Sequence, residues 1–149
     1  MLDDLYNGKI LGYAANISRV GKLDQPDASA TAVSKLCGSK VTIDIVSDGE
    51  TISDYAQTVR ACALGQAACA MVAEAVIGAS YSEIAEARSG LAEMLVGDAV
   101  VNGGRFDALK YLEPVKDHKA RHASTMLALD ALVDAMDQIR ATHALEAAG

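Results

Sequence analysis

The chain contains no tryptophan and one phenylalanine, Phe106, among its 149 residues. With so few aromatic rings, we expect a core of Ala, Val, Ile, Leu and Met, a composition that suits closely packed helices. No apolar run approaches the roughly 18 residues that a membrane-spanning helix needs. Residues 1–4 include two aspartates where a secretory signal would carry its apolar segment. We therefore expect no membrane span, no secretory leader and no membrane partner.

Cysteine is also scarce. The three cysteines are Cys37, Cys62 and Cys69, and an odd number of thiols in a chain of this length does not form a disulfide framework. At least one thiol would stay free. Together with the absence of a signal segment, this indicates a reducing, cytoplasmic environment.

Positive charge is in short supply, because the formal net charge is −7. This balance argues against nucleic acid as a partner, since basic patches provide most of the affinity for phosphates. The basic residues are scattered except for a cluster formed by Lys116, Lys119 and Arg121 with His118 and His122 between them. Two interpretations stay open for this cluster: a solvated loop that leads into a helix, or a positive rim beside a thiolate or another anionic site.

Recognisable catalytic motifs are absent as well. The sequence has no nucleophile–His–acid order, no phosphate-binding glycine loop and no paired-carboxylate motif, so we expect that the protein is not an enzyme. Its composition is that of a globular chain, with 51% hydrophobic and 22% charged residues. A length of 149 residues fits one domain over residues 1–149 better than two.

Alternation of apolar and polar residues predicts a small sheet. The clearest strand covers residues 40–46, where Val41, Ile43 and Ile45 fall on one face. A loop over residues 17–30 is expected to lead into an edge strand, and a weaker strand is predicted over 31–36. Residues 47–50 supply a hairpin turn, and 51–59 pair back as a further strand.

Helical periodicity follows over most of the remaining chain. A short helix over residues 3–16 is weakened by two glycines and needs tertiary support. Ser80 and Glu83 have the spacing of a capping box, and Pro114 is expected to break a short helix. The predicted helices cover residues 3–16, 64–77, 80–96, 106–112 and 123–147. The fold class is therefore α+β, with a small antiparallel sheet of about three strands and helices packed on one face.

Two cysteines occupy junctions between predicted elements. Cys62 lies between a strand and a helix, where the positive end of the helix dipole favours thiolate over thiol. Cys37 lies just before a strand, and the hairpin is expected to bring the two thiols to the same end of the sheet. Such a pair is half of a four-ligand site for a soft metal. Cys69, inside an alanine-rich helix, is expected to fill the core.

The order of these features resembles the U-type iron–sulfur cluster scaffolds, the family of IscU, SufU and the N-terminal domain of NifU. The shared features are a docking N-terminal helix, Cys37-Gly38 at a strand start, a hairpin into Cys62 at a helix start, and a long last helix. The resemblance covers nearly the whole chain, and the extra length from about Leu95 to Pro114 looks like the SufU branch. It implies a scaffold that receives iron, and sulfur from a cysteine desulfurase as persulfide, holds a labile cluster, expected to be [2Fe–2S], and passes it to acceptor or carrier proteins. A monomer and a homodimer both stay open.

In that family three cysteines and a nearby acid form the site. Cys37 matches the first cysteine, Ser39 falls where the acid is usual, and Cys62 matches the second cysteine. An ungapped match to the last helix places the third cysteine on Ser124, whereas a shift by two places it on His122. We prefer the ungapped match.

The remaining groups are expected to act as follows. Cys37 and Cys62 would be cluster ligands or persulfide acceptors, with His122 as a candidate third metal ligand, because imidazole binds both zinc and iron. Ser124 is expected to cap the last helix. The alternative is a zinc-binding or metal-free adaptor, or a sulfur relay, in the same machinery.

Overall fold

The computed structural model describes residues 7–36, 38–97 and 104–148. Its sheet has three antiparallel strands in the order β1 (Ala28–Ser34), β2 (Ser39–Ser47) and β3 (Ile52–Arg60). Val41, Ile43 and Ile45 of β2 are fully buried, because alternate residues of a strand point to the same face. The strong alternation of residues 40–46 thus selects the face of the sheet that contacts the helices.

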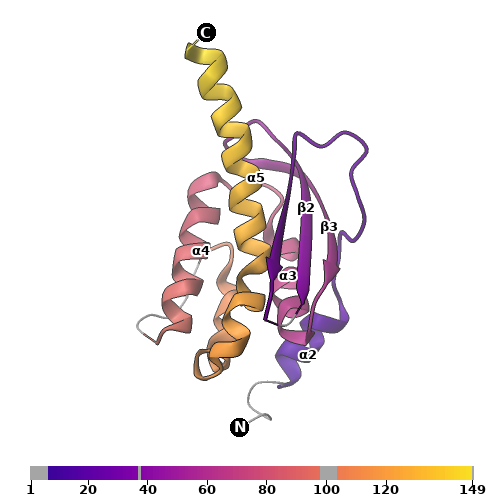
Figure 1. Ribbon diagram of the computed structural model, residues 1–149, viewed down its shortest axis with the longest axis vertical. Coiled ribbons are helices and arrows are strands. Elements are labelled where there is room, and N and C mark those ends of the chain that lie inside the picture. Colours follow the sequence, from indigo (N-terminus) through magenta and orange to yellow (C-terminus); the bar gives the residue numbers. More distant parts are fainter. Residues whose placement is uncertain (1–6, 37, 98–103, 149) are drawn as a thin grey trace.

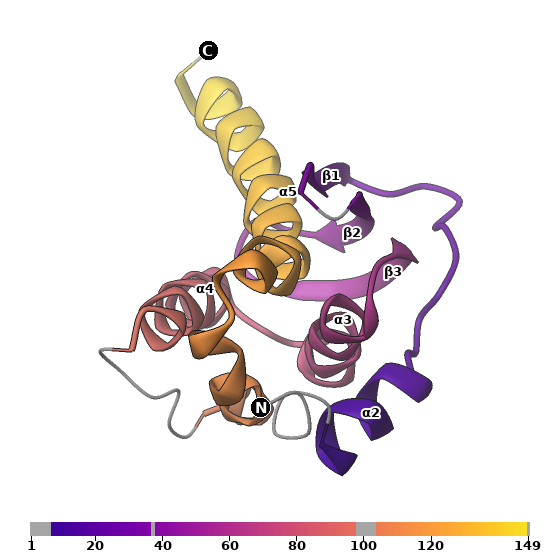
Figure 2. The same cartoon turned by 60° about the horizontal axis from the view of Figure 1, so that its bottom comes forward.

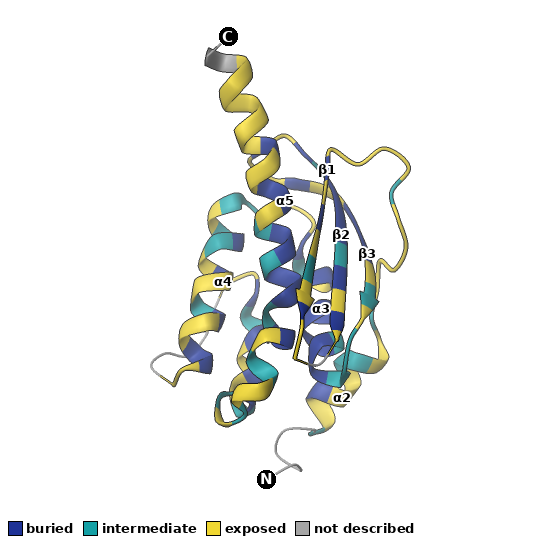
Figure 3. Ribbon diagram, in the orientation of Figure 1, coloured by how far each residue is buried: buried dark blue, intermediate teal, exposed yellow. Residues whose placement is uncertain are grey.

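Over the described segments, helices cover that face only. α3 (Ala63–Ala75) packs on β3, and the long α5 (His122–Ala148) crosses β1 and β2, while α4 (Tyr81–Leu95) lies against α5. Figures 1 and 2 show α3 and α5 on the same side of the sheet. Figure 3 shows the buried residues concentrated between these helices and the strands. The expected α+β arrangement is confirmed.

The weak N-terminal helix docks, as its composition requires. α2 (Gly8–Ala15) is capped by Asn7, whose side chain accepts a hydrogen bond of 3.1 Å from the Ile10 amide. Ile10 is fully buried in the core. The ring of Tyr13 lies 6.4 Å from the ring of Tyr111, centroid to centroid. These tertiary contacts compensate for the low helix propensity of its two glycines.

The opposite face of the sheet is polar. The hydroxyls of Thr31 and Thr42 lie 2.9 Å apart on adjacent strands. At the free edge of β3, the segment before β1 adds a short parallel bridge between Val20 and Gln57. The buried Gln57 amide donates to the Ser18 carbonyl at 3.0 Å. This segment covers an edge that would otherwise present unpaired backbone groups.

Most predicted elements are present, with two corrections. The capping box of Ser80 and Glu83 is confirmed in both directions. The first strand begins and ends earlier than predicted, since β1 covers Ala28–Ser34. Pro114 does not break a helix: it lies inside the 3₁₀ helix η1 (Asp107–Asp117). The fixed φ of proline is close to 3₁₀ values, so the ring fits there. No helix of the described segments is long and apolar enough to cross a membrane.

Candidate functional site

Cys62 is the N-cap residue of α3. Its backbone is extended, with φ −68° and ψ 172°, and its carbonyl accepts the first helical hydrogen bond, 2.9 Å from the Gln66 amide. The thiol makes no side-chain capping bond and is half-buried. The Cys62 sulfur therefore lies at the N-terminal, positive end of a thirteen-residue helix.

The closest polar contact of this thiol comes from the start of α5. The Cys62 Sγ lies 3.7 Å from the Ser124 Oγ, within hydrogen-bond range for sulfur. Ser124 is only 1% exposed, and its hydroxyl also donates to the Arg121 carbonyl at 3.1 Å. That carbonyl accepts a second hydrogen bond of 2.7 Å from the Thr125 hydroxyl. The Ser124 hydroxyl can therefore donate to the Cys62 sulfur instead, because the Arg121 carbonyl would still accept the hydrogen bond from Thr125.

The expected capping role of Ser124 is wrong. α5 begins at His122, so Ser124 lies inside the first turn and its hydroxyl points back to a carbonyl instead of to a free amide. The ungapped match placed the third family cysteine on this residue. Ser124 is in contact with Cys62, and the match itself stays a prediction.

A glycine allows the starts of α3 and α5 to come this close. A Cβ built on Gly65 would lie 2.8 Å from the Ala61 Cβ and 3.2 Å from the Ser124 carbonyl oxygen. Ordinary contacts between carbon atoms are about 3.5–4.0 Å. An added Cβ would require Ala61 to shift and the Ser124 backbone to give by a few tenths of an ångström. Gly65 was not identified from the sequence, because its contact with Ser124 joins segments far apart in the chain.

His122 is held by η1. Its Nε2 lies 3.0 Å from the Val115 carbonyl oxygen and 3.1 Å from that of Lys116. With its proton on Nε2, the ring donates to both carbonyls, which leaves Nδ1 as the nitrogen with a lone pair for a metal. The assignment of His122 as a metal ligand stays a prediction.

Cys37 lies outside the described residues, but both sides of it are placed. Gly38 has a φ of +72°, a left-handed conformation that favours glycine, and its amide donates to the Ser34 carbonyl at 2.8 Å. Ser39 starts β2 and is 3% exposed. Since Lys40 pairs directly with Arg60, the residues that flank positions 37 and 62 share one end of the sheet. The pairing of Cys37 with Cys62 as ligands stays a prediction.

Within the described residues, no three His, Cys, Asp or Glu side chains lie together in a way that could hold a metal ion. Cys69 is separate from the site: it is fully buried in α3, and burial raises the pKa of its thiol to about 12. The expected core role of Cys69 is confirmed. Among the described residues, the reactive groups at this end of the sheet are the Cys62 thiol and the Ser124 hydroxyl. The thiol of Cys37 is a further candidate from the sequence.

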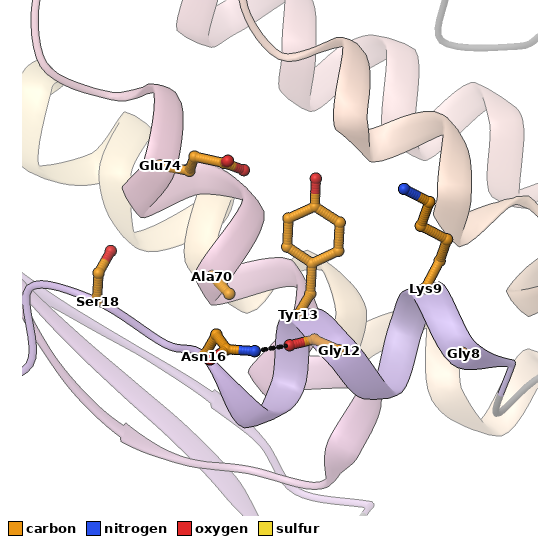
Figure 4. Close-up of a pocket in the computed structure, with 8 residues that line it drawn as sticks. All are labelled: Gly8, Lys9, Gly12, Tyr13, Asn16, Ser18, Ala70 and Glu74. Atoms are coloured by element: carbon orange, nitrogen blue, oxygen red, sulfur yellow. Dashed lines mark hydrogen bonds between the residues drawn. The ribbon is translucent and has the colours of Figure 1, made fainter.

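A separate groove of about 370 Å³ lies between α2 and α3. Figure 4 shows Tyr13 between the side chains of Lys9 and Glu74, and the Asn16 amide bonded to the Gly12 carbonyl at 2.6 Å. Burial, then the neighbouring Glu74 carboxylate, raise the pKa of Tyr13. Glu74 is about 18 Å along α3 from Cys62 at 1.5 Å per residue. This groove is not part of the thiol site.

Comparison with known proteins finds one matching family model and solved structures that share this fold. A family model described as the NifU-like N terminal domain matches residues 5–144. The crystal structure of a nitrogen-fixing NifU-like protein (N-terminal) from Brucella abortus is 47% identical, with a TM-score of 0.91 over 93% of this chain and 96% of that one. A putative iron–sulfur cluster assembly scaffold protein for the SUF system from Fervidobacterium islandicum shares the fold at 22% identity, with a TM-score of 0.82 over 90% and 98% of the two chains. A search among curated proteins found no match.

Proposed function

Because the chain belongs to the family of NifU-like N-terminal domains, we propose that it is a scaffold for the assembly of iron–sulfur clusters. The single observation that carries this proposal is the placement of Cys62. Cys62 is a half-buried thiol at a helix N-terminus, in contact with the start of α5, and such a thiol is suited to act as the cluster ligand that the resemblance implies. The protein would hold and hand over its cargo without turning over a substrate.

The donor set fits a cluster that is held loosely. Iron–sulfur clusters are normally bound by four cysteine thiolates, and histidine replaces some of them in known sites. Here Cys37 and Cys62 would supply two sulfur ligands and His122 one nitrogen. The Ser124 hydroxyl, already in contact with the Cys62 sulfur, would donate a hydrogen bond to the bound thiolate. A site with an open fourth position suits a [2Fe–2S] cluster that must leave for an acceptor protein.

Sulfur would arrive as a persulfide from a cysteine desulfurase. The Cys62 thiolate attacks the outer sulfur of the donor persulfide, the sulfur–sulfur bond of the donor breaks, and the donor cysteine leaves as a thiolate. Cys62 then carries the persulfide, and an external reductant supplies the two electrons that release sulfide. Cluster acceptor or carrier proteins would take the product. The cytoplasmic location expected from the sequence stays a prediction.

A second candidate is a zinc-binding or metal-free adaptor, or a sulfur relay, in the same machinery. One observation favours it: a serine, Ser124, occupies the position matched to the third cysteine. A sulfur relay needs only one reactive thiol, and Cys62 provides it. Zinc could be held by the two cysteines and His122 with one position left open.

Anaerobic reconstitution with iron, sulfide and a reductant separates the two candidates. Wild type, Cys37→Ala, Cys62→Ala and His122→Ala would be compared by absorption spectrum and by metal and sulfide analysis. Cys69→Ala is the matched control, because this buried cysteine is remote from the site. Charge-transfer bands that disappear in both site-cysteine variants but persist in the control support the scaffold. A wild-type protein that takes up zinc or no metal, and forms no bands, contradicts it.

A further inference from the structure

Several acidic residues lie at the end of the sheet that carries the β2–β3 hairpin. Asp48 and Glu50 lie in the β2–β3 hairpin, and Asp134 and Asp137 lie in the half of α5 that approaches it. The Arg140 guanidinium joins α5 to this hairpin with a 3.0 Å hydrogen bond to a backbone carbonyl. In Figure 1 this acidic end is at the top, beside the later turns of α5.

The other end of the sheet, next to Cys62, carries exposed cations. Lys40 of β2 lies directly opposite Arg60 of β3, and Val33 of β1 lies opposite Lys40 on the other side. All three side chains are exposed. They form one row across the face of the sheet that no helix covers. We call Lys40 and Arg60 the cation row, and Val33 lies beside it.

The turn that joins β1 to β2 extends this surface. Lys35 is exposed there, and the Leu36 side chain is 73% exposed. Val33 is 55% exposed. Two exposed aliphatic side chains beside three cations make an amphipathic surface, and Arg60 connects it along the chain to Cys62.

The fold does not require these cations. Among the described residues, no ion pair involves Lys35, Lys40 or Arg60, whereas five other basic side chains are paired: Arg88, Arg105, Lys110, Lys116 and Arg140. Like charges directly opposite each other on antiparallel strands destabilise the pairing. Lys40 and Arg60 are such a pair. An anionic group bound between them would remove the repulsion, at the end of the sheet that carries the Cys62 thiol.

We propose that the cation row docks an acidic, partly apolar segment of a protein partner and holds it beside Cys62. Carboxylates of the partner would meet Lys40 and Arg60, and its aliphatic side chains would cover Val33 and Leu36. The role of this partner as a donor or acceptor of sulfur or cluster rests on the proposed function. The surface itself does not, since it follows from the charge and exposure of these residues.

A nucleic acid or an anionic membrane fits this surface less well. Both present negative charge over an extended area, and the remainder of a chain with a net charge of −7 would repel them. A short acidic protein segment needs only the few cations of the row. Opposite charges of this kind also accelerate and orient docking, which suits a site that must meet its partners repeatedly.

A short peptide of glutamate and leucine residues is the probe for the test. We expect amide chemical shifts of the intact protein to change most at β2 and β3 near Lys40 and Arg60, with affinity that falls as salt is added. The double variant Lys40→Ala/Arg60→Ala should bind at least about tenfold more weakly. Lys110→Ala/Arg88→Ala removes the same charge from η1 and α4, which lie on the helix side of the sheet, and should bind like wild type.

Lys40→Glu separates binding from folding. It replaces a repulsion across the strands with an attraction to Arg60, so its thermal midpoint should equal or exceed that of wild type while peptide binding is lost. Equal binding by wild type and Lys40→Ala/Arg60→Ala would overturn the proposal, as would equal losses in the two double variants. Tighter binding of an oligonucleotide or of anionic vesicles through the same residues would overturn it too. All measurements use protein without iron or sulfide, so a failed reconstitution leaves this result unaffected.

Discussion

Gly65→Ala offers the sharpest test of how the thiol site is built. Gly to Ala normally stabilises a helix interior by up to about 1 kcal/mol. Here the added Cβ would lie 2.8 Å from the Ala61 Cβ and 3.2 Å from the Ser124 carbonyl oxygen. The second neighbour is backbone and cannot turn away, so α5 must move relative to α3.

The magnitude follows from these two opposing effects. Overpacking of a tight interior costs about 1–3 kcal/mol, which exceeds the gain in helix propensity. We expect a net loss of about 1 kcal/mol, or about 2–4 °C in thermal midpoint for a protein of this size. Gly12→Ala is the control, since nothing lies within 4 Å of a Cβ at that position of α2, and it should be neutral or stabilising.

Denaturant unfolding and thermal unfolding of the two variants provide the measurement. Gly65→Ala should lower the free energy of unfolding, and Gly12→Ala should not. Amide chemical shifts near Cys62 and Ser124 should change in the first variant only. If Gly65→Ala were as stable as wild type or more so, close approach of the backbones would not be what the glycine provides.

Three further predictions concern the thiols and one helix cap. Ser124→Cys should give Cys62 a neighbouring thiolate and lengthen the lifetime of a reconstituted cluster severalfold, as followed by the decay of its absorption; a lifetime no longer than that of wild type would contradict the placement of the third ligand. Burial raises the pKa of Cys69 to about 12 and that of Tyr55 well above its usual value, so the folded state keeps protons that the unfolded state loses. The free energy of unfolding should therefore fall as the pH rises above about 9, and Cys69→Ala should weaken that dependence in unfolding curves taken at several pH values. Ser80→Ala removes the N-cap of α4 and should cost about 1 kcal/mol in denaturant unfolding; no loss would mean that the capping box contributes little.

Much of this fold could be predicted from the sequence, because the relevant interactions are local. The alternation of Val41, Ile43 and Ile45 identifies a strand and its buried face, and Ser80 with Glu83 marks the start of α4. Such signals depend on residues a few positions apart, so they are visible without knowledge of the fold. The ends of the elements were harder to predict. A helix was expected to stop before Pro114, but Asp107–Asp117 forms a 3₁₀ helix that includes it, and tertiary packing selects that conformation.

The candidate site depended on tertiary structure. The position of Cys62 at a strand–helix junction was visible in the sequence, but its contact with Ser124 required α5 to cross α3, and Gly65 to allow it. The orientation of His122 toward two carbonyls of η1 was likewise invisible. The sequence by itself determined which residues could be strands, helices and thiol ligands, because those properties are local. Which side chains meet at the end of the sheet was decided by helix packing between segments far apart in the chain.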